Sequence, residues 1–162
     1  MRKLRDKLSS IFSIKHKVIM DKEIYAEHFW RGISNKDFIS DGHVLYTAFQ
    51  FDETDRTDKC RELSINWDDD EGAVKKLLEQ KKDNGNIQFR GGATKLSLAA
   101  VKIILKQYID SKQFSYERRI VEGNDYHGNL LVSADLSKQL RNQISNGLAL
   151  VAGTYIIDQN NE

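Results

Sequence analysis

The sequence predicts a single α+β domain with a mixed, mainly antiparallel sheet and three or four helices. Segments typical of strands are interspersed with segments whose apolar residues recur at helical spacing. The length of 162 residues suits one domain with a hydrophobic core, and 7 Phe, 6 Tyr and 2 Trp supply large side chains for that core. We expect residues 21–158 to form the domain and residues 159–162 to be a polar tail.

Strands are predicted where apolar residues alternate with polar ones or form short runs bounded by turn residues. The segment from Glu62 to Asp68 alternates most clearly, which points Leu63, Ile65 and Trp67 toward the core. The segment from Val44 to Phe51 is bulky on both faces, which predicts a strand that is covered on both sides. The other segments expected to be extended are Tyr25–Ile33, Ile87–Arg90, Ala93–Leu96, Gln113–Glu122 and Leu148–Ile157.

Three helices are predicted inside the domain from start signals that precede apolar stripes. The acidic run from Asp68 to Glu71 starts the first helix, and Asn84-Gly85 ends it. Ser97 caps the second helix, and Ser133 caps the third, which ends at Gly147. The three stripes are Ala73, Val74, Leu77 and Leu78; Val101, Ile104, Leu105 and Tyr108; and Leu136, Leu140 and Ile144.

Residues 1–20 differ from the rest of the chain because they are basic and amphipathic. Their one acidic residue is Asp6. The basic residues are Arg2, Lys3, Arg5, Lys7, Lys15 and Lys17, and the apolar residues at helical spacing are Leu4, Leu8, Ile11 and Phe12. We expect a basic helix or arm that packs on its own domain or contacts a protein partner. Binding to an acidic membrane surface is less favoured, because membrane affinity grows with buried apolar area and this stripe is short.

Composition disfavours several classes of protein. The net charge of +1 argues against a broad nucleic-acid-binding face, although the basic residues of 1–20 keep such binding as an alternative. The single cysteine, Cys60, allows no intrachain disulfide and no thiolate metal cluster, and we expect neither a metal nor another cofactor. The absence of proline, with abundant Asn, Lys, Asp and Ile, indicates a bacterial or phage coding sequence.

The sequence also bears on location. No run approaches the roughly 20 apolar residues of a membrane-spanning helix. The N-terminus lacks the apolar region and the cleavage site of a signal peptide. We therefore expect a cytoplasmic protein without a transmembrane segment.

The stretch from Gly123 to Val132 holds the densest group of candidate binding residues. It carries turn-forming residues between a predicted strand and a predicted helix, and loops on rigid flanks often carry binding groups. The imidazole of His127 ionises near neutral pH, Asp125 lies close enough in sequence to orient it, and Asn129 can donate or accept a hydrogen bond. The alternative is an ordinary turn whose histidine bonds a main-chain carbonyl group. The candidates from this stretch are Asp125, Tyr126, His127 and Asn129.

Arg31 is the candidate for binding an anion. A guanidinium group binds a carboxylate or a phosphate through two parallel hydrogen bonds, and the neighbouring Gly32 would let a ligand approach. The alternative is an ion pair with one of the many acidic residues of the chain. Arg118 and Arg119 carry the same two alternatives.

The order of several short motifs resembles that of a group of small, uncharacterised bacterial proteins. The motifs are Arg31 after an aromatic pair, Ala48-Phe49, Leu63–Asn66, Ala93–Leu98, Tyr126–Asn129 and Leu148-Ala149. The resemblance covers most of the chain from Trp30 onward. No activity is established for that group, so the resemblance implies no function, but it directs attention to Arg31, Ser64 and His127 as candidate binding residues.

Two functions from different classes follow as hypotheses. The first is a non-catalytic binding or accessory module that acts with a larger bacterial protein or complex, because no catalytic motif is present and residues 1–20 suit a partner. The second is a small phosphate-handling enzyme of the nuclease or nucleotidyl- or ADP-ribosyl-transfer type. In it, Arg31 would hold anionic oxygens, His127 would act as general acid or base, and Asn129 or Ser64 would position the substrate. The second hypothesis requires Arg31 and His127 to share one pocket.

Overall fold

The centre of the fold is an antiparallel sheet, seen in a computed structural model that describes residues 25–54, 59–152 and 156–157. The expected helix or arm of residues 1–20 and the tail of residues 159–162 lie outside these ranges. Six strands follow the order β7-β8-β5-β1-β6-β9, and β4 also pairs with β5. The strands are β1 (His28–Gly32), β4 (Asp52–Glu53), β5 (Cys60–Trp67), β6 (Ala93–Ser97), β7 (Phe114–Arg118), β8 (His127–Ser133) and β9 (Ile156–Ile157).

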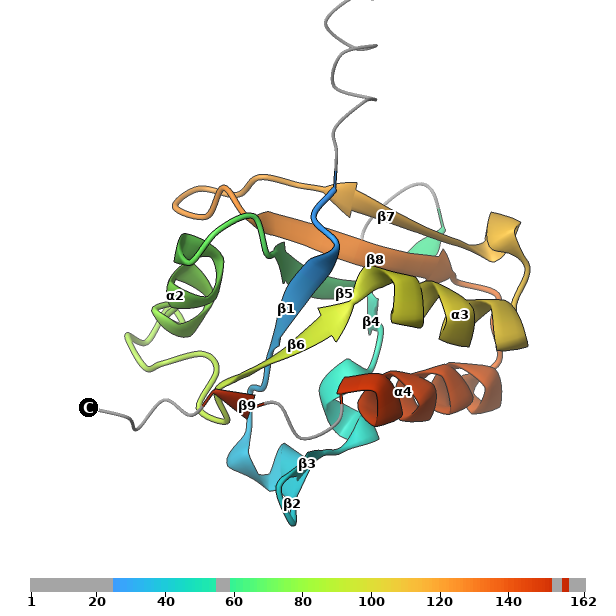
Figure 1. Cartoon of the computed structure of the whole chain (residues 1–162), viewed down its shortest axis with the longest axis horizontal. Helices are drawn as coiled ribbons and strands as arrows, with labels where there is room; N and C mark the ends of the chain where they lie inside the picture. The colour runs from blue at the N-terminus through green and yellow to red at the C-terminus, as the bar shows by residue number, and fades with distance from the viewer. Residues whose placement is uncertain (1–24, 55–58, 153–155, 158–162) are drawn as a thin grey trace, which may run out of the picture.

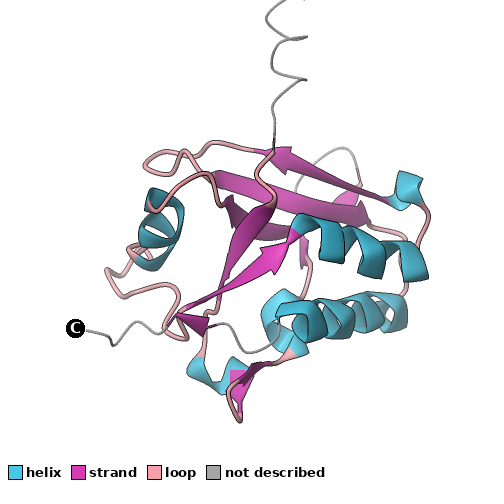
Figure 2. Ribbon diagram, viewed as in Figure 1, coloured by secondary structure: helices cyan, strands magenta, loops and turns pink. Residues whose placement is uncertain are grey.

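Helices lie on both faces of this sheet (Figure 1). The two long helices, α3 (Leu98–Tyr108) and α4 (Lys138–Ala152), pack side by side against one face, and the short α2 (Gly72–Leu78) lies against the other. A small second sheet pairs β2 (Ile39–Ser40) with β3 (His43–Val44), and three 3-10 turns join the elements (Figure 2). The predicted α+β class is confirmed, and every strand pairing among the described residues is antiparallel.

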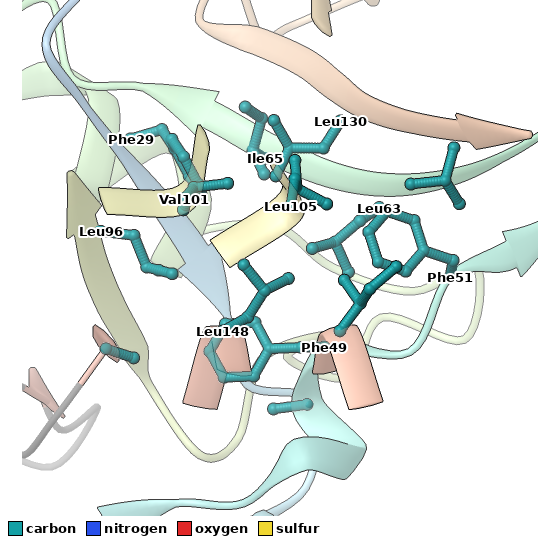
Figure 3. Close-up of a cluster of buried hydrophobic side chains, with 14 of the residues drawn as sticks. Phe29, Phe49, Phe51, Leu63, Ile65, Leu96, Val101, Leu105, Leu130 and Leu148 are labelled. Atoms are coloured by element: carbon teal, nitrogen blue, oxygen red, sulfur yellow. The ribbon is translucent and has the colours of Figure 1, made fainter. Parts of the chain in front are cut away.

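The main core lies between the sheet and the helices α3 and α4. The pleat of β5 places Leu63, Ile65 and Trp67 on this side, as the alternation of the sequence predicted. Val101 and Leu105 of α3 belong to the same cluster and lie on the side toward which Leu63 and Ile65 point (Figure 3). The other labelled members in the close-up are Phe29, Phe49, Phe51, Leu96, Leu130 and Leu148. A smaller cluster on the opposite face joins α2 to β1 and β6 and consists of Trp30, Ala73, Leu77, Phe89 and Ala93.

The prediction of a strand from Val44 to Phe51 is wrong. β3 ends at Val44, and residues Tyr46–Phe49 form a 3-10 turn that packs against α4. The hydroxyl of Ser145 on α4 donates a hydrogen bond to the carbonyl oxygen of Phe49 at 2.8 Å, which holds the turn in place. The bulk on both faces of this segment therefore reflects a buried turn, which periodicity alone does not distinguish from a buried strand.

The segment between α2 and β6 also differs from the prediction. α2 ends at Leu78, whereas Gly85, with a φ of +81°, sits in a separate turn. The expected strand from Ile87 to Arg90 is reduced to one isolated bridge between Lys81 and Ile87. Glycine marks a turn here without marking the end of the helix.

The last helix is longer than predicted, at the expense of the strand expected from Leu148 to Ile157. Leu148 and Ala152 continue the buried ridge of Ile144 at intervals of four residues, so the helix runs on to Ala152. Gly147 does not end the helix, because it faces α3: a Cβ there would lie 2.5 Å from Ile104 Cγ2. The cap is Ser137, whose hydroxyl accepts from Leu140 N at 3.1 Å, in place of the predicted Ser133.

No helix in the described part of the chain combines the length and apolar character needed to cross a membrane.

Candidate functional site

The face of the sheet opposite α3 and α4 carries a row of polar residues, which we call the polar sheet face. In the register of β5 and β8, Ser64 lies opposite Asn129, and Asn66 lies opposite His127. Their neighbours Leu63, Ile65 and Leu130 point into the main core, so these four polar side chains point to the other side. The polar sheet face consists of Glu62, Ser64 and Asn66 on β5, His127 and Asn129 on β8, Glu117 on β7, and Arg119 just beyond β7. Three of the predicted candidates, Ser64, His127 and Asn129, therefore come together.

Asn129 lies at the centre of the polar sheet face and is fully buried. Its amide nitrogen donates to Glu117 Oε1 at 3.1 Å. Its amide oxygen is buried and has no hydrogen-bond partner among the described residues. The reversed amide would turn this oxygen toward the carboxylate, so the contact with Glu117 fixes the orientation. A buried acceptor is thus left without a donor.

An ion pair between Arg119 and Glu62 crosses over Asn129. Along β8, Arg119 lies opposite His127 and Glu62 lies opposite Leu131. Asn129 lies midway between His127 and Leu131, so the contact between Arg119 and Glu62 passes over its side chain. The nitrogen–oxygen distance is 3.6 Å, which is too long for a good hydrogen bond, and Glu62 Oε2 has no hydrogen-bond partner. The guanidinium side chain is 53% exposed. The pair therefore covers Asn129 but leaves both acceptors unsatisfied.

His127 makes a hydrogen bond to a main-chain carbonyl group, which was the predicted alternative to a binding role. Its Nδ1 lies 2.7 Å from the carbonyl oxygen of Arg119. Because a carbonyl oxygen only accepts, Nδ1 carries the proton in this contact. Asp125 is exposed, and no hydrogen bond or ion pair joins it to His127 among the described residues. The proposed orientation of His127 by Asp125 is therefore not observed.

The turn before β8 is fixed by a pair of buried amides. Asn124 donates to Asn66 Oδ1 at 2.9 Å, and Asn66 donates to the carbonyl oxygen of Ala73 at 2.9 Å. Asn124 Oδ1 accepts from the main-chain nitrogen of Tyr126 at 3.2 Å. The stretch around Gly123 is thus the tip of a hairpin between β7 and β8, and it does not lead into a helix as expected. The side-chain amides of Asn66 and Asn124 therefore make hydrogen bonds within the hairpin and to α2, and we assign both residues a structural role.

Tyr126 links this hairpin to the start of α2. Its hydroxyl donates to Asp70 Oδ1 at 2.8 Å. That hydrogen bond raises the pKa of Tyr126 above its ordinary value of 10.0, and burial and the charges of Asp70, Asp69 and Asp125 raise it further. The contact therefore stabilises the fold below pH 10, and this contribution is lost as the pH rises through the raised pKa.

We predict that replacing Asp70 with asparagine returns the pKa of Tyr126 toward 10.0, because the strongest acceptor and the nearest negative charge are removed together. NMR titration of the labelled tyrosine ring measures this pKa. Asp125→Asn is the matched control, because Asp125 makes the smallest contribution and has no hydrogen bond to the ring. Equal pKa changes in the two variants would contradict the assignment.

Arg31 lies on the other side of the sheet, toward α3 and α4, because it alternates with Trp30 and shares its side with Phe29 and Ile33. Its Nε donates to the carbonyl oxygen of Ala48 at 2.9 Å, and its Nη1 donates to the carbonyl oxygen of Ser64 at 2.8 Å. Arg31 and His127 therefore lie on opposite faces and line no common pocket among the described residues.

The position of Arg31 has a structural cause. β1 pairs with β5 only at Trp67 and Asn66, and β4 pairs with β5 only at Glu62 and Arg61. In residues 25–54, 59–152 and 156–157, no strand lies beside the edge of β5 between these two pairings, and the guanidinium of Arg31 supplies a donor there. Burial lowers the pKa of Arg31 to about 10, although the charge of Asp52 opposes this shift.

The other two arginines of the sequence prediction take different roles. The guanidinium of Arg118 makes a bidentate ion pair with the carboxylate of Asp69, with nitrogen–oxygen distances of 2.6 and 2.5 Å. Arg119 forms the ion pair on the polar sheet face described above. Arg118 and Arg119 therefore both pair with an acidic residue, which was the alternative to anion binding.

A shallow pocket of about 240 Å³ continues the polar sheet face toward the far end of β8. Ser115 and Leu131 line it and share the side of Asn129, because Ser115 lies opposite Leu131 in the register. Lys59, Lys112 and Cys60 also line it. Sequence reasoning missed this pocket, and it did not name Glu62 or Glu117 as site residues, although alternation along the three strands carries a signal for them.

No protein-family model, curated protein or solved structure matches the chain. Among the described residues, no group of three or more His, Cys, Asp or Glu side chains is placed to hold a metal ion.

Proposed function

We propose that the protein is a non-catalytic binding module that acts as an accessory to a larger protein or complex, and that it recognises its partner through the polar sheet face. The observation that carries this proposal is the buried, unsatisfied amide oxygen of Asn129 on a face that neither α3 nor α4 covers. Native proteins satisfy most buried polar atoms, and an exception is a candidate for a contact that a partner completes. The adjoining pocket at Ser115 extends the surface that a partner would cover. Residues 1–20 would supply further contacts.

The geometry of Arg31 favours this proposal over a phosphate-handling enzyme. That alternative needs the guanidinium of Arg31 and the imidazole of His127 in one pocket. Both hydrogen bonds of the guanidinium are made to main-chain carbonyl groups, on the side of the sheet away from His127. The guanidinium of Arg31 and the imidazole of His127 therefore do not share the pocket that the alternative requires.

The test is the mass of the full-length protein recovered from its native cells under gentle conditions. We expect a complex well above the monomer mass of 18.7 kDa in size-exclusion chromatography with light scattering. Ser115→Arg should release the monomer, because Ser115 is exposed beside the pocket and a long charged side chain there would obstruct a partner. Gln107→Arg adds the same group on the exposed side of α3 and should leave the complex intact. Recovery of the unaltered protein as a lone monomer would refute the proposal.

A further inference from the structure

We infer that the polar sheet face contains a subsite for a cationic hydrogen-bond donor, a lysine ammonium or an arginine guanidinium that the partner presents over Asn129. This inference rests on the proposed function and names the chemistry of the partner at one point. The partner's cation would donate to Asn129 and Glu62, and it would replace the side chain of Arg119.

Two buried acceptors define the subsite. Within the part of the chain that the structure describes, the amide oxygen of Asn129 and Oε2 of Glu62 both lack a hydrogen-bond partner, and both belong to side chains on the same face of neighbouring strands. A buried acceptor without a donor is costly, so a ligand that supplies donors gains more here than at an exposed site. The complementary group must therefore donate hydrogen bonds, because an anion or a carbonyl group would add a third acceptor.

The surrounding charges favour a cation over a neutral donor. The carboxylates of Glu62 and Glu117 lie on β5 and β7, on either side of the β8 strand that carries Asn129. Hydrogen bonds between a cationic donor and a carboxylate are about twice as strong as neutral ones. Arg118 lies opposite Gly128 and its guanidinium lies over the rings of Tyr25 and Trp67, so its side chain points to the other face of the sheet.

Arg119 shows which kind of group the subsite accepts. Its guanidinium already lies near Glu62, but at 3.6 Å it forms an ion pair without a hydrogen bond. Because the Arg119 side chain is 53% exposed and makes no hydrogen bond to Glu62, a better-placed cation can displace it at small cost. The side chain of Arg119 therefore occupies the subsite weakly, and a basic side chain of the partner would replace it.

The subsite is tested with the isotopically labelled full-length protein and a small ammonium probe, Nα-acetyl-lysine N-methylamide. We expect a saturable shift of the side-chain amide resonance of Asn129 in the nitrogen–proton spectrum. The same compound with an acetylated ε-amine removes the charge and should leave that resonance unmoved. No shift with the charged probe, or an equal shift with the neutral one, would overturn the inference.

Three variants sharpen the assignment. Glu62→Gln should weaken the binding of the ammonium probe about tenfold, because a charge-assisted hydrogen bond becomes a neutral one. Arg119→Ala should tighten binding, because the competing guanidinium is removed. Glu53→Gln is the matched control: Glu53 also pairs with an arginine, Arg61, but it lies at β4 and should not affect binding. Equal effects of Glu62→Gln and Glu53→Gln, or weaker binding by Arg119→Ala, would contradict the subsite.

The two proposals fail in different ways. If Ser115→Arg disrupts the native complex but the Asn129 resonance does not shift with the ammonium probe, the proposed binding module is supported and the cationic subsite is wrong. If the probe binds at Asn129 but the native protein is a lone monomer, the subsite stands and the proposed partner is wrong. The folded state of each variant is read from the same spectra, and Arg119→Ala decides the matter if Glu62→Gln does not fold.

Discussion

Replacing Trp67 with alanine is expected to lower the free energy of unfolding by about 4 kcal/mol. Trp67 is fully buried, and its ring lies 4.8 Å from Tyr25, 6.0 Å from Phe29 and 5.9 Å from Tyr116, measured between ring centroids. Its indole nitrogen also donates to the carbonyl oxygen of Glu117 at 3.1 Å. The substitution removes the largest side chain among the fully buried residues and the hydrogen bond that joins it to the edge strand β7.

Urea denaturation followed by circular dichroism measures this loss. Trp67→Phe keeps an aromatic ring but removes the hydrogen bond, and it should cost less than Trp67→Ala. Ile103→Ala is the surface control, because Ile103 is 61% exposed, and it should change stability by about 0.5 kcal/mol or less. A loss below about 1 kcal/mol in Trp67→Ala would show that the ring is not the centre of the core.

Arg31→Met is expected to lower the free energy of unfolding by about 3 kcal/mol, because it leaves the carbonyl oxygens of Ala48 and Ser64 without their donor. Removing a half-buried charge recovers some desolvation energy, which keeps the loss below the sum of two unsatisfied groups. Denaturation in urea measures the change.

The control for Arg31 is Arg61→Met. Arg61 pairs with Glu53 at 2.8 Å, but Glu53 is 83% exposed, so this loss should stay below about 1 kcal/mol. Arg31→Met should also leave the binding of the ammonium probe to Asn129 unchanged in protein that remains folded. Unchanged stability together with lost ligand binding would make Arg31 a binding residue and contradict its structural role.

The fold was predictable where a pattern is local. The alternation from Glu62 to Trp67 identified β5 and its buried side, and Ser97 identified the start of α3, where its hydroxyl accepts from Ala100 N. Local patterns failed where packing between distant elements decides. The 3-10 turn around Phe49 depends on Ser145, which is 96 residues away. The C-terminal end of α4 follows the burial of Leu148 and Ala152 in the core, and Gly147 lets the helix pass close to Ile104 of α3.

The candidate site was predictable in its members but not in its arrangement. Ser64, His127 and Asn129 share a face only because of the register between β5 and β8, which short motifs do not specify. Arg31 looked like an anion-binding residue because sequence does not reveal that β1 and β5 separate beyond Trp30 and leave a carbonyl group to be satisfied. Arg119 was expected either to bind an anion or to pair with an acidic residue, and it pairs with Glu62, but its relation to Asn129 depends on three strands at once.

The central claim is that the polar sheet face, and not the side of α3 and α4, contacts the partner. Site-specific photocrosslinking in native cells tests it most directly, with benzoylphenylalanine replacing Ser115 in one variant and Gln107 in another. Both positions are exposed, and they lie on opposite sides of the molecule's sheet. We predict a discrete crosslinked product from position 115 and none from position 107. A product from position 107 with none from position 115 would contradict the account.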